Sequence, residues 1–301
     1  MFVSTNIGSY LATGSGLQTA VLNELRRLGV RPKKSLGQNF LVSESVLSDI
    51  LDVACIEAGD HVVEIGPGLG VLTERLVRKG ASVLAIEKDD TFARHLKDAF
   101  AHVPAVTVLH SDILMLRSLL QVLKTFKPAH GAKLKVVSNI PYNITSDLLS
   151  VLLPMRGALQ SIHLLLEAGA AERLTQAQPG DKDYRAMSVI VQLYSQARTC
   201  FGVSRSAFHP VPGVDSAVAE FILHDQLDER LLEHEAAFVA FINGAFSMKR
   251  KTLANNLKRT FPQPDIEKCF DNSALSPLVR AESLDLDTFV ALFGCFQARS
   301  S

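Results

Sequence analysis

Residues 61–70 read His61-Val62-Val63-Glu64-Ile65-Gly66-Pro67-Gly68-Leu69-Gly70, and the amphipathic stretch of residues 71–79 follows directly. The order is an apolar strand, a glycine-rich turn and a helix. Glycines let the backbone come close to a ligand, and the start of the helix presents unpaired N–H groups to an anionic group. Strand-like and helix-like runs alternate from here to about Leu223, which predicts an α/β fold with a doubly wound parallel sheet.

The glycine spacing departs from the dinucleotide fingerprint. The third glycine follows the second after one residue, and Glu64 precedes the turn by two positions. A carboxylate there would repel a pyrophosphate, but it can order the loop or attract the cationic end of a ligand. S-adenosylmethionine has no pyrophosphate; it has a carboxylate, an ammonium, a ribose and an adenine. The loop therefore favours S-adenosylmethionine over a dinucleotide.

Acidic residues follow two further predicted strands. Residues 82–86 end at Glu87, about twenty residues beyond the loop, and residues 105–109 lead to Asp112. In open parallel sheets, ligands bind at the carboxyl ends of the strands. We therefore expect Glu87 to accept both ribose hydroxyls of the cofactor, and Asp112 to accept from its adenine amine.

The tetrapeptide Asn139-Ile140-Pro141-Tyr142 closes another apolar run and is suited to hold an exocyclic amine beside an aromatic face. The side-chain oxygen of Asn139 and a main-chain carbonyl, at Ile140 or Pro141, can accept the two N–H groups of such an amine. Pro141 stiffens the turn and removes a competing donor. Tyr142 can stack on the base. An isolated match of this kind only ends a strand, but beside the glycine-rich loop it indicates a base-modifying enzyme.

Five ordered segments carry a resemblance that covers nearly all of the chain: residues 34–41, 64–70, 139–142, 208–217 and 246–257. Together they resemble the small-subunit ribosomal RNA adenine N6,N6-dimethyltransferase family, which is KsgA (RsmA) in bacteria and Dim-type in eukaryotes. The resemblance implies a Rossmann-like, S-adenosylmethionine-dependent methyltransferase sheet with a small C-terminal helical domain.

The resemblance also implies roles for individual residues. The expected catalytic residues are Asn139, Pro141, Tyr142 and Phe208, of which Asn139, Tyr142 and Phe208 face the target adenine. The residues expected to bind the cofactor are Asn39, Leu41, Glu64, Gly66, Gly68, Glu87, Asp112 and Asn139. No metal is expected.

The implied reaction is methyl transfer to two adjacent adenosines near the 3′ end of small-subunit (16S) rRNA during ribosome assembly. The implied partner is the pre-30S particle, and the enzyme is expected to be a cytoplasmic monomer that binds no membrane. Two basic RNA contacts are expected to differ, because residues 166–173 lack the usual glutamine-lysine-glutamate run and Gly213 stands where lysine is common. The usual glycine-arginine after Tyr184 reads Arg185-Ala186, so that loop is expected to differ in shape.

We expect three segments: a lead-in at residues 1–30, a methyltransferase domain at 31–223 and a helical RNA- or ribosome-binding domain at 224–301. The lead-in is rich in serine and threonine, which suits an organelle transit peptide. Residues 17–28 nevertheless alternate as an amphipathic helix that includes Glu24, which favours a short cytoplasmic helix.

The net charge is zero, with 31 basic and 31 acidic residues, so composition alone gives no signal for nucleic acid. Two local basic runs supply one. They contain Arg26, Arg27, Arg31, Lys33 and Lys34, and Lys249, Arg250, Lys251, Lys258 and Arg259. The cysteines Cys55, Cys200, Cys269 and Cys295 have no paired spacing, which predicts reduced thiols.

Three other functions compete with this hypothesis. An Erm-type enzyme would modify an adenine of large-subunit rRNA, but residues 210–217 and 249–253 lean toward the small subunit. Mitochondrial transcription factors resemble the same family, so the fold can serve mainly to bind nucleic acid; the intact cofactor and Asn-x-Pro-Tyr motifs count against that. A nucleotide-dependent dehydrogenase leaves Tyr142 unexplained.

Overall fold

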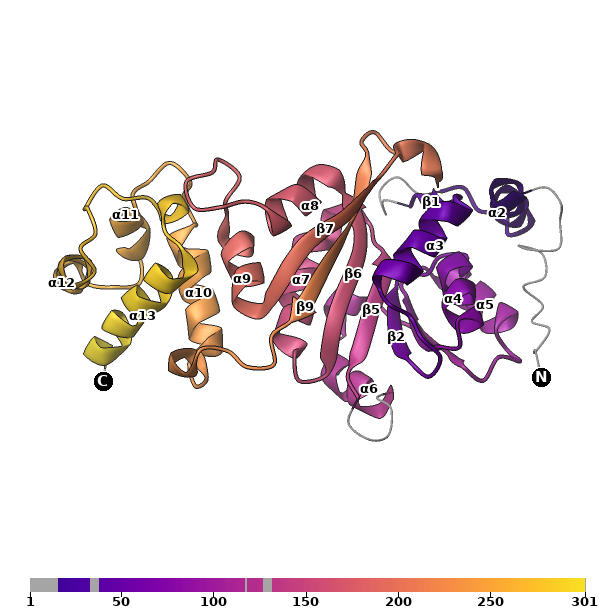
Figure 1. Ribbon diagram of the computed structural model, residues 1–301, viewed down its shortest axis with the longest axis horizontal. Coiled ribbons are helices and arrows are strands. Elements are labelled where there is room, and N and C mark those ends of the chain that lie inside the picture. The colour runs from indigo at the N-terminus through magenta and orange to yellow at the C-terminus, as the bar shows by residue number, and fades with distance from the viewer. Residues whose placement is uncertain (1–15, 33–37, 117, 127–131, 301) are drawn as a thin grey trace. The chain divides into compact units, whose positions relative to one another are not determined.

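The computed structural model describes residues 16–32, 38–116, 118–126 and 132–300 (Figure 1). The internal contacts of the chain divide it into two units. The first, here the sheet unit, comprises Met1–Ala171 and Arg198–Leu223. The second, the helical unit, comprises Glu172–Ala197 and His224–Ser301.

A seven-stranded sheet forms the centre of the sheet unit, with the order β4-β3-β2-β5-β6-β9-β7. Strands β2 to β6 pair in parallel, and β9 pairs antiparallel to β6. The strand bounds are β2 (His61–Ile65), β3 (Ser82–Glu87), β4 (Val106–His110), β5 (Leu134–Asn139), β6 (Leu159–Glu167), β7 (Ser195–Val203) and β9 (Ser216–Leu223). The predicted doubly wound α/β fold is confirmed. The order reverses between β2 and β5, where ligands bind in such sheets.

The central strands are apolar on both faces. In β2 every residue after His61 is buried, and in β3 every residue after Ser82 is buried. Parallel strands that are covered on both sides need such continuous apolar runs. The buried exceptions are Glu64 and Glu87, two carboxylates at the ends of these strands.

The helices of the sheet unit begin at recognisable caps. Ser43 accepts a hydrogen bond from Val46 N at the start of α3, and Asp89 accepts one from Thr91 N at the start of α5. The helices are α2 (Gly16–Arg27), α3 (Glu44–Val53), α4 (Val71–Arg78), α5 (Asp90–Ala99), α6 (Leu119–Phe126) and α7 (Thr145–Leu152), and α8 (Ala168–Thr175) crosses the division between the units. Shorter elements are β1 (Phe40–Leu41), β8 (Phe208–His209) and the 3-10 helices η2 (Ile113–Met115) and η3 (Tyr142–Ile144).

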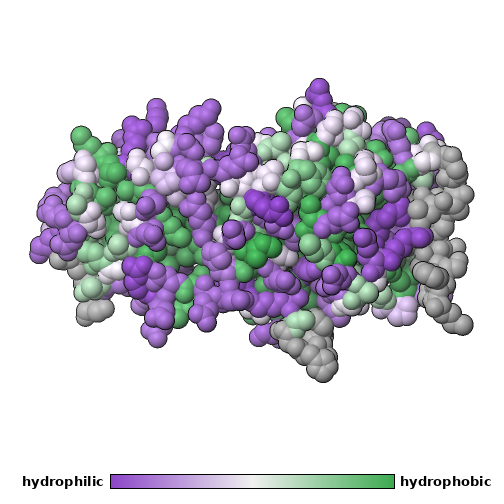
Figure 2. Space-filling model, viewed as in Figure 1, coloured by the Kyte–Doolittle hydropathy of each residue, from purple (hydrophilic) through white to green (hydrophobic). Residues whose placement is uncertain are grey.

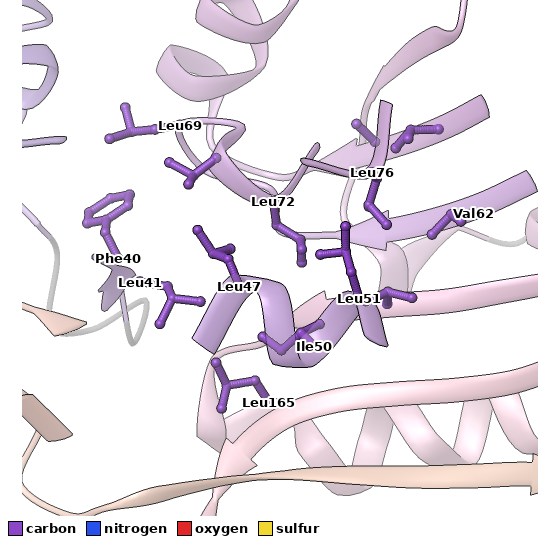
Figure 3. Packing of buried hydrophobic residues seen from close by; sticks show 14 of the residues in the cluster. Phe40, Leu41, Leu47, Ile50, Leu51, Val62, Leu69, Leu72, Leu76 and Leu165 are labelled. Atoms are coloured by element: carbon purple, nitrogen blue, oxygen red, sulfur yellow. The ribbon is translucent and has the colours of Figure 1, made fainter. Parts of the chain in front are cut away.

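The hydrophobic core joins the first helices to the sheet. Figure 3 shows side chains of α3 and α4 facing one another, with Phe40 and Leu41 of β1 beside them. The predicted amphipathic helix near the N-terminus is present as α2, and its residues Leu17, Val21 and Leu25 are buried in this core. Residues 1–15 of the lead-in lie outside the described residues.

The helical unit has an aromatic core. Phe241 contacts several other phenylalanines, and Phe261 stacks on Phe296 with ring centroids 4.1 Å apart. The helices are α9 (Ala186–Tyr194), α10 (Glu235–Ala245), α11 (Leu253–Leu257), α12 (Gln263–Asn272) and α13 (Leu286–Ser300). Residues 172–197, which the sequence assigned to the first domain, have their contacts in this unit, because α9 packs on α10 and α13.

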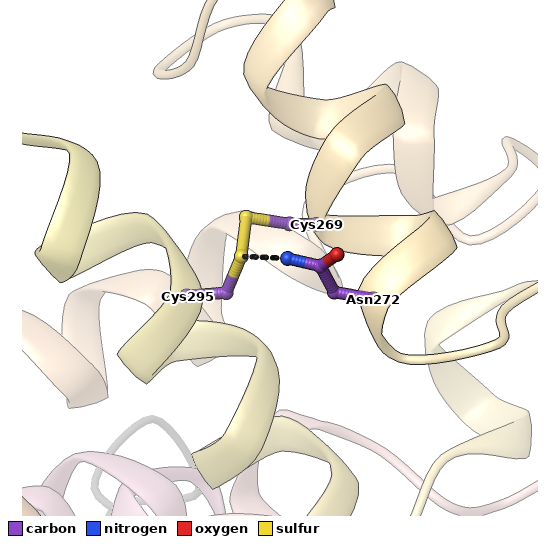
Figure 4. The surroundings of a disulfide bond; sticks show 3 residues. All are labelled: Cys269, Asn272 and Cys295. Carbon is purple, nitrogen blue, oxygen red and sulfur yellow. Dashed lines mark hydrogen bonds between the residues drawn. A yellow bond between two sulfur atoms is a disulfide. The ribbon is translucent and has the colours of Figure 1, made fainter.

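The prediction that the cysteines are reduced thiols is wrong for one pair. Cys269 of α12 and Cys295 of α13 form a disulfide, with Cα atoms 5.7 Å apart (Figure 4). The two residues are 26 positions apart in the chain, and this spacing does not by itself predict that they pair. They meet because α12 and α13 pack against each other. Cys55 and Cys200 are free.

Hydrophilic residues cover much of the face drawn in Figure 2, with smaller hydrophobic patches between them. Within the described ranges, no helix combines the length and the apolar character that a membrane crossing requires. Both basic runs lie at the surface where they are described: Arg26, Arg27 and Arg31 are exposed, and so are Lys249, Arg250, Lys251, Lys258 and Arg259. Lys33 and Lys34 lie outside the described residues.

Candidate active site

A cleft of about 280 Å³ lies at the carboxyl ends of β2, β3, β4 and β5. Each strand contributes the residues that follow it directly, and residues 38–41 add a further wall. The cleft is lined at Gln38, Asn39, Phe40, Leu41, Leu47, Glu64, Ile65, Gly66, Pro67, Gly68, Leu69, Val71, Leu72, Ile86, Glu87, Lys88, Asp89, Phe92, Ser111, Asp112, Ile113, Leu114, Asn139, Ile140, Pro141, Tyr142, Asn143 and Ile144. Its volume is near the lower end of the range for small-molecule sites, roughly 300–1,000 Å³. Every predicted site residue except Phe208 is among them.

The glycine-rich loop depends on glycine at two positions for different reasons. A Cβ on Gly70, at φ 83°, would come within 2.8 Å of Leu96 Cδ2, so this glycine lets the loop pack on α5. At Gly66, with φ 68°, a Cβ would meet nothing within 4 Å. The backbone at Gly66 is therefore open toward the cleft and accessible to a ligand.

Two buried acids hold this loop. Glu87 accepts hydrogen bonds from Gly68 N at 3.0 Å and from Asp89 N at 2.7 Å, so its carboxylate ties the loop to the end of β3. Glu64 accepts from Thr73 Oγ1 at 2.5 Å, which ties β2 to the first turn of α4. Burial raises the pKa of Glu87, and it raises the pKa of Glu64 to about 8. Near neutral pH, Glu64 is therefore largely protonated and acts as a polar brace for the loop.

Asp112 lies at the other end of the cleft. Its Oδ1 caps η2 by accepting from Leu114 N at 3.1 Å, and its Oδ2 is 2.7 Å from Lys88 Nζ. The ammonium group of Lys88 holds the pKa of Asp112 below its usual value, so the carboxylate stays charged. The sequence did not identify Lys88, because a lysine after a strand looks like any solvated side chain.

Asn139 ends β5 with its amide group oriented. Its Nδ2 donates to the main-chain oxygen of Asn39 at 3.1 Å. Because the nitrogen end of the amide is used in this way, the oxygen end is the one that can accept from a ligand. The contact joins two motifs that lie 100 residues apart in the sequence.

Tyr142 makes one hydrogen bond through its main chain and one through its side chain. Its main-chain carbonyl accepts from Thr145 Oγ1 at 3.0 Å, and its phenolic oxygen lies 2.7 Å from Ser216 Oγ. Burial raises the pKa of Tyr142, and the nearby Glu167 carboxylate raises it further, whereas the bond to Ser216 opposes the shift. The phenol is therefore protonated near neutral pH. The sequence included Ser216 in a motif but gave it no role.

The structure does not bring Phe208 to the cleft. Its side chain is 1% exposed and belongs to the hydrophobic core. The reason is strand pairing, since β8 pairs antiparallel to β1 with Phe208 opposite Leu41. Phe208 is therefore absent from the lining of the cleft, and its role toward the target adenine stays a prediction.

The charges of the cleft fit S-adenosylmethionine. The ionisable side chains of its lining are the acids Glu64, Glu87, Asp89 and Asp112 and the base Lys88, and of the acids Glu64 is largely protonated near neutral pH. Such a lining disfavours a pyrophosphate and suits a ligand with a sulfonium and an ammonium group. Within the described part of the chain, no group of three or more His, Cys, Asp and Glu residues is placed to hold a metal ion.

The sheet is parallel from β4 to β6, reverses its order between β2 and β5 and carries an acidic cleft at that point, which defines a Rossmann-like α/β protein with a small-molecule site. The model of one family, described as ribosomal RNA adenine dimethylase, matches residues 29–297. The chain belongs to this family.

Individual relatives and structures agree with the family. The ribosomal RNA small subunit methyltransferase A of Latilactobacillus sakei is 38% identical over 276 residues, which cover 90% of this chain and 92% of the relative. The chloroplastic ribosomal RNA small subunit methyltransferase of Arabidopsis thaliana is 37% identical over 278 residues, which cover 91% of this chain and 81% of the relative. In fold, the chain is similar to a dimethyladenosine transferase from Plasmodium falciparum, with a TM-score of 0.67, 23% identity and coverage of 87% of this chain and 98% of the other. It is also similar in fold to the 23S rRNA methyltransferase ErmE, with a TM-score of 0.61 and 22% identity. This match covers 86% of this chain and 100% of the other.

Proposed function

We propose that this chain transfers methyl groups from S-adenosylmethionine to adenine N6 in small-subunit ribosomal RNA. The product is N6,N6-dimethyladenosine at two adjacent positions near the 3′ end of 16S rRNA, formed during ribosome assembly. The observation that carries this proposal is the position of Asn139 and Tyr142. An oriented amide oxygen and an aromatic ring line the same cleft as the glycine-rich loop and Glu87. The family and its small-subunit relatives support the choice of substrate.

The cofactor would lie between the loops that follow β2, β3 and β4. In this proposal Glu87 accepts the ribose hydroxyls, Asp112 accepts from the adenine amine, and the open backbone at Gly66 approaches the methionine end. When bound, S-adenosylmethionine supplies an electrophilic methyl group on a positively charged sulfur. Asn39 and Leu41 belong to residues 38–41, which form a further wall of the cleft.

The residues that follow β5 would prepare the nucleophile. The N6 lone pair of adenine is delocalised into the ring, which makes it a weak nucleophile. Asn139 Oδ1 and a carbonyl at Ile140 or Pro141 accept its two N–H hydrogens, which returns electron density to the nitrogen, while Tyr142 stacks on the base. Positioning supplies most of the remaining rate enhancement. No dedicated general base is required, since the alkylated amine is acidic and releases its proton to water.

We propose that RNA is held through its phosphates by the exposed basic runs. Lys249, Arg250 and Lys251 form the densest group, and Lys258 and Arg259 follow on the same unit. The target adenine would be splayed out of its helix, because base edges inside A-form RNA are hard to reach. The natural substrate would be a pre-30S particle that is bound by one copy of the chain.

We place the reaction in the cytoplasm, where the sequence predicted it. The disulfide between Cys269 and Cys295 is a counter-argument, because disulfides are rare in reducing compartments. Fractionation of cells that express the tagged full chain, with thiol labelling of each fraction, decides the point. Recovery in an organelle would overturn the assignment.

Transfer of labelled methyl groups to undermethylated ribosomal subunits tests the function. Purified small and large subunits are incubated separately with the chain and labelled S-adenosylmethionine, and the nucleosides are identified by mass spectrometry. We expect N6,N6-dimethyladenosine in the small subunit alone. Label in the large subunit would instead indicate an Erm-type activity. Cofactor binding without any label would indicate a nucleic-acid-binding protein.

A further inference from the structure

The hydroxyl group of Ser216 is buried directly behind the aromatic wall of the cleft. Ser216 begins β9, where it pairs with Glu167 of β6, and it is 1% exposed. Its Oγ lies 2.7 Å from the phenolic oxygen of Tyr142. A residue 74 positions further along the chain thus contacts the ring that would stack on the target base.

We propose that Ser216 is a positioning residue that fixes the ring of Tyr142, and that the second methyl transfer depends on it more than the first. This inference rests on the proposed function and assigns Ser216 a part in it. Ser216 does not line the cleft, so it acts only through Tyr142.

One hydrogen bond of Tyr142 holds its main chain, and the other holds the far end of its ring. Thr145 Oγ1 donates to the main-chain oxygen of Tyr142 at 3.0 Å and fixes the start of η3. Ser216 fixes the far end, at the phenolic oxygen. Without Ser216 the ring keeps its anchor at the backbone but is free to rotate about its side-chain bonds. A stacking ring that rotates holds a base less well, because stacking requires the two planes to stay parallel and close.

The second transfer needs the ring more because the substrate has changed. Adenine N6 presents two N–H hydrogens in the first transfer, one to Asn139 and one to a carbonyl. After one methylation a single N–H remains, so one of these two contacts is lost. Stacking on Tyr142 then supplies a larger share of the orientation. A loosened ring should therefore release the monomethylated base before the second methyl group is transferred.

The charges around this contact are compatible with the role. Burial and the Glu167 carboxylate both favour the neutral phenol of Tyr142, so the hydroxyl pair keeps its proton over the working range. Either oxygen can donate. The contact is therefore a neutral hydrogen bond, whose net worth is typically modest.

The test measures the two products of the full chain on undermethylated small subunits. The variants are Ser216→Ala, which removes the anchor, and Tyr142→Phe, which removes the other partner but keeps the ring. We expect each variant to slow the second transfer by about 3- to 10-fold, the worth of one such hydrogen bond. N6-methyladenosine should accumulate at early times, with the KM for the subunit nearly unchanged. The double variant should show no further loss, because both changes remove the same contact.

Ser161→Ala is the matched control, because Ser161 is a buried serine on β6 that is absent from the cleft. Thermal unfolding of each variant verifies that the fold is intact, and Ser216→Thr, which restores a hydroxyl, should recover the ratio of products. A wild-type ratio of mono- to dimethylated product in Ser216→Ala would overturn the inference, as would additive effects in the double variant. Failure of the proposed function looks different, because the unaltered chain would then put no dimethyladenosine into the small subunit.

Discussion

At the scale of single residues, the geometry divides the polar groups of the cleft into two kinds. Glu64 and Glu87 are buried and hold the glycine-rich loop. Asn139 is half-buried, with its nitrogen already engaged by Asn39 and its oxygen able to accept. Substitution of Glu64 should therefore affect stability, whereas substitution of Asn139 should affect catalysis.

Asn139→Ala should abolish methyl transfer while leaving part of the cofactor affinity. The amide oxygen is the proposed acceptor for the adenine amine, and loss of one such positioned group typically costs on the order of 10²-fold in rate or more. Single-turnover methylation and calorimetric titration with S-adenosylmethionine measure the two effects separately. Asn255→Ala, at an exposed asparagine of α11, is the control. Near-normal turnover in the Asn139 variant would remove this residue from the mechanism.

Glu64→Gln should make the protein more stable at higher pH. Folding raises the pKa of Glu64 from 4.5 to about 8, so between these values the folded chain binds a proton that the unfolded chain does not. The contribution of Glu64 to the free energy of unfolding is therefore constant below pH 4.5, falls as the pH rises from 4.5 to about 8, and levels off above pH 8.

Each unit of this pKa shift corresponds to about 1.4 kcal/mol, so the benefit of the uncharged glutamine should reach several kcal/mol at pH 8. Glutamine can still accept from Thr73. Denaturant unfolding of both proteins between pH 5 and pH 8 measures the difference. If the free energies of unfolding of the two proteins changed with pH in parallel, Glu64 would not be buried as a protonated acid.

At the scale of elements, helix α2 helps to support the glycine-rich loop. His95 of α5 is 7% exposed and lies between two elements: its Nε2 is 3.3 Å from the main-chain oxygen of Leu69, and its Nδ1 is 3.4 Å from Glu24 of α2. Arg27 also reaches His95 Nδ1. Burial lowers the pKa of His95, so a neutral ring that donates to Leu69 and accepts from Arg27 satisfies both of its nitrogens. A segment outside the predicted methyltransferase domain thus helps to hold the glycine-rich loop.

His95→Ala should weaken binding of S-adenosylmethionine although His95 does not line the cleft. The loss of one buried hydrogen bond to the loop corresponds to roughly 0.5–1.5 kcal/mol, or about 2- to 10-fold in affinity. Calorimetric titration measures this, and His102→Ala, at an exposed histidine just beyond α5, is the control. An unchanged affinity in the His95 variant would mean that α2 supports only the core.

At the scale of the whole molecule, the net charge is zero, but positive side chains gather locally at the surface. Lys249, Arg250 and Lys251 are consecutive and exposed, and they belong to the helical unit. Attraction to RNA phosphates depends on such local charge and releases bound counterions.

Reversal of these three charges to glutamate should weaken binding to the small subunit and flatten its dependence on salt. Each phosphate contact that is lost lowers the slope of log K against log salt by roughly 0.7 to 0.9. Filter binding at several salt concentrations gives the slope for the variant and for the control Lys268→Glu, at a single exposed lysine of α12. A slope equal to that of the unaltered chain would show that the run is simply a solvated surface.

The sequence determined those features that depend on neighbouring residues. The glycine-rich turn after β2, the acid that ends β3, the acid that follows β4 and the Asn-Ile-Pro-Tyr segment at the end of β5 were all identified from the sequence. The reason is that a parallel sheet brings the ends of its strands to one edge. The fold class followed from the same alternation.

Only the tertiary structure decided the contacts between distant segments. It placed Ser216 on Tyr142, Lys88 on Asp112 and Cys269 on Cys295, and it buried Phe208 in the core. It also assigned residues 172–197 to the helical unit, through the packing of α9. The reason is physical: strand periodicity and turn chemistry are local, whereas the direction in which a side chain points depends on which strands pair and which helices pack.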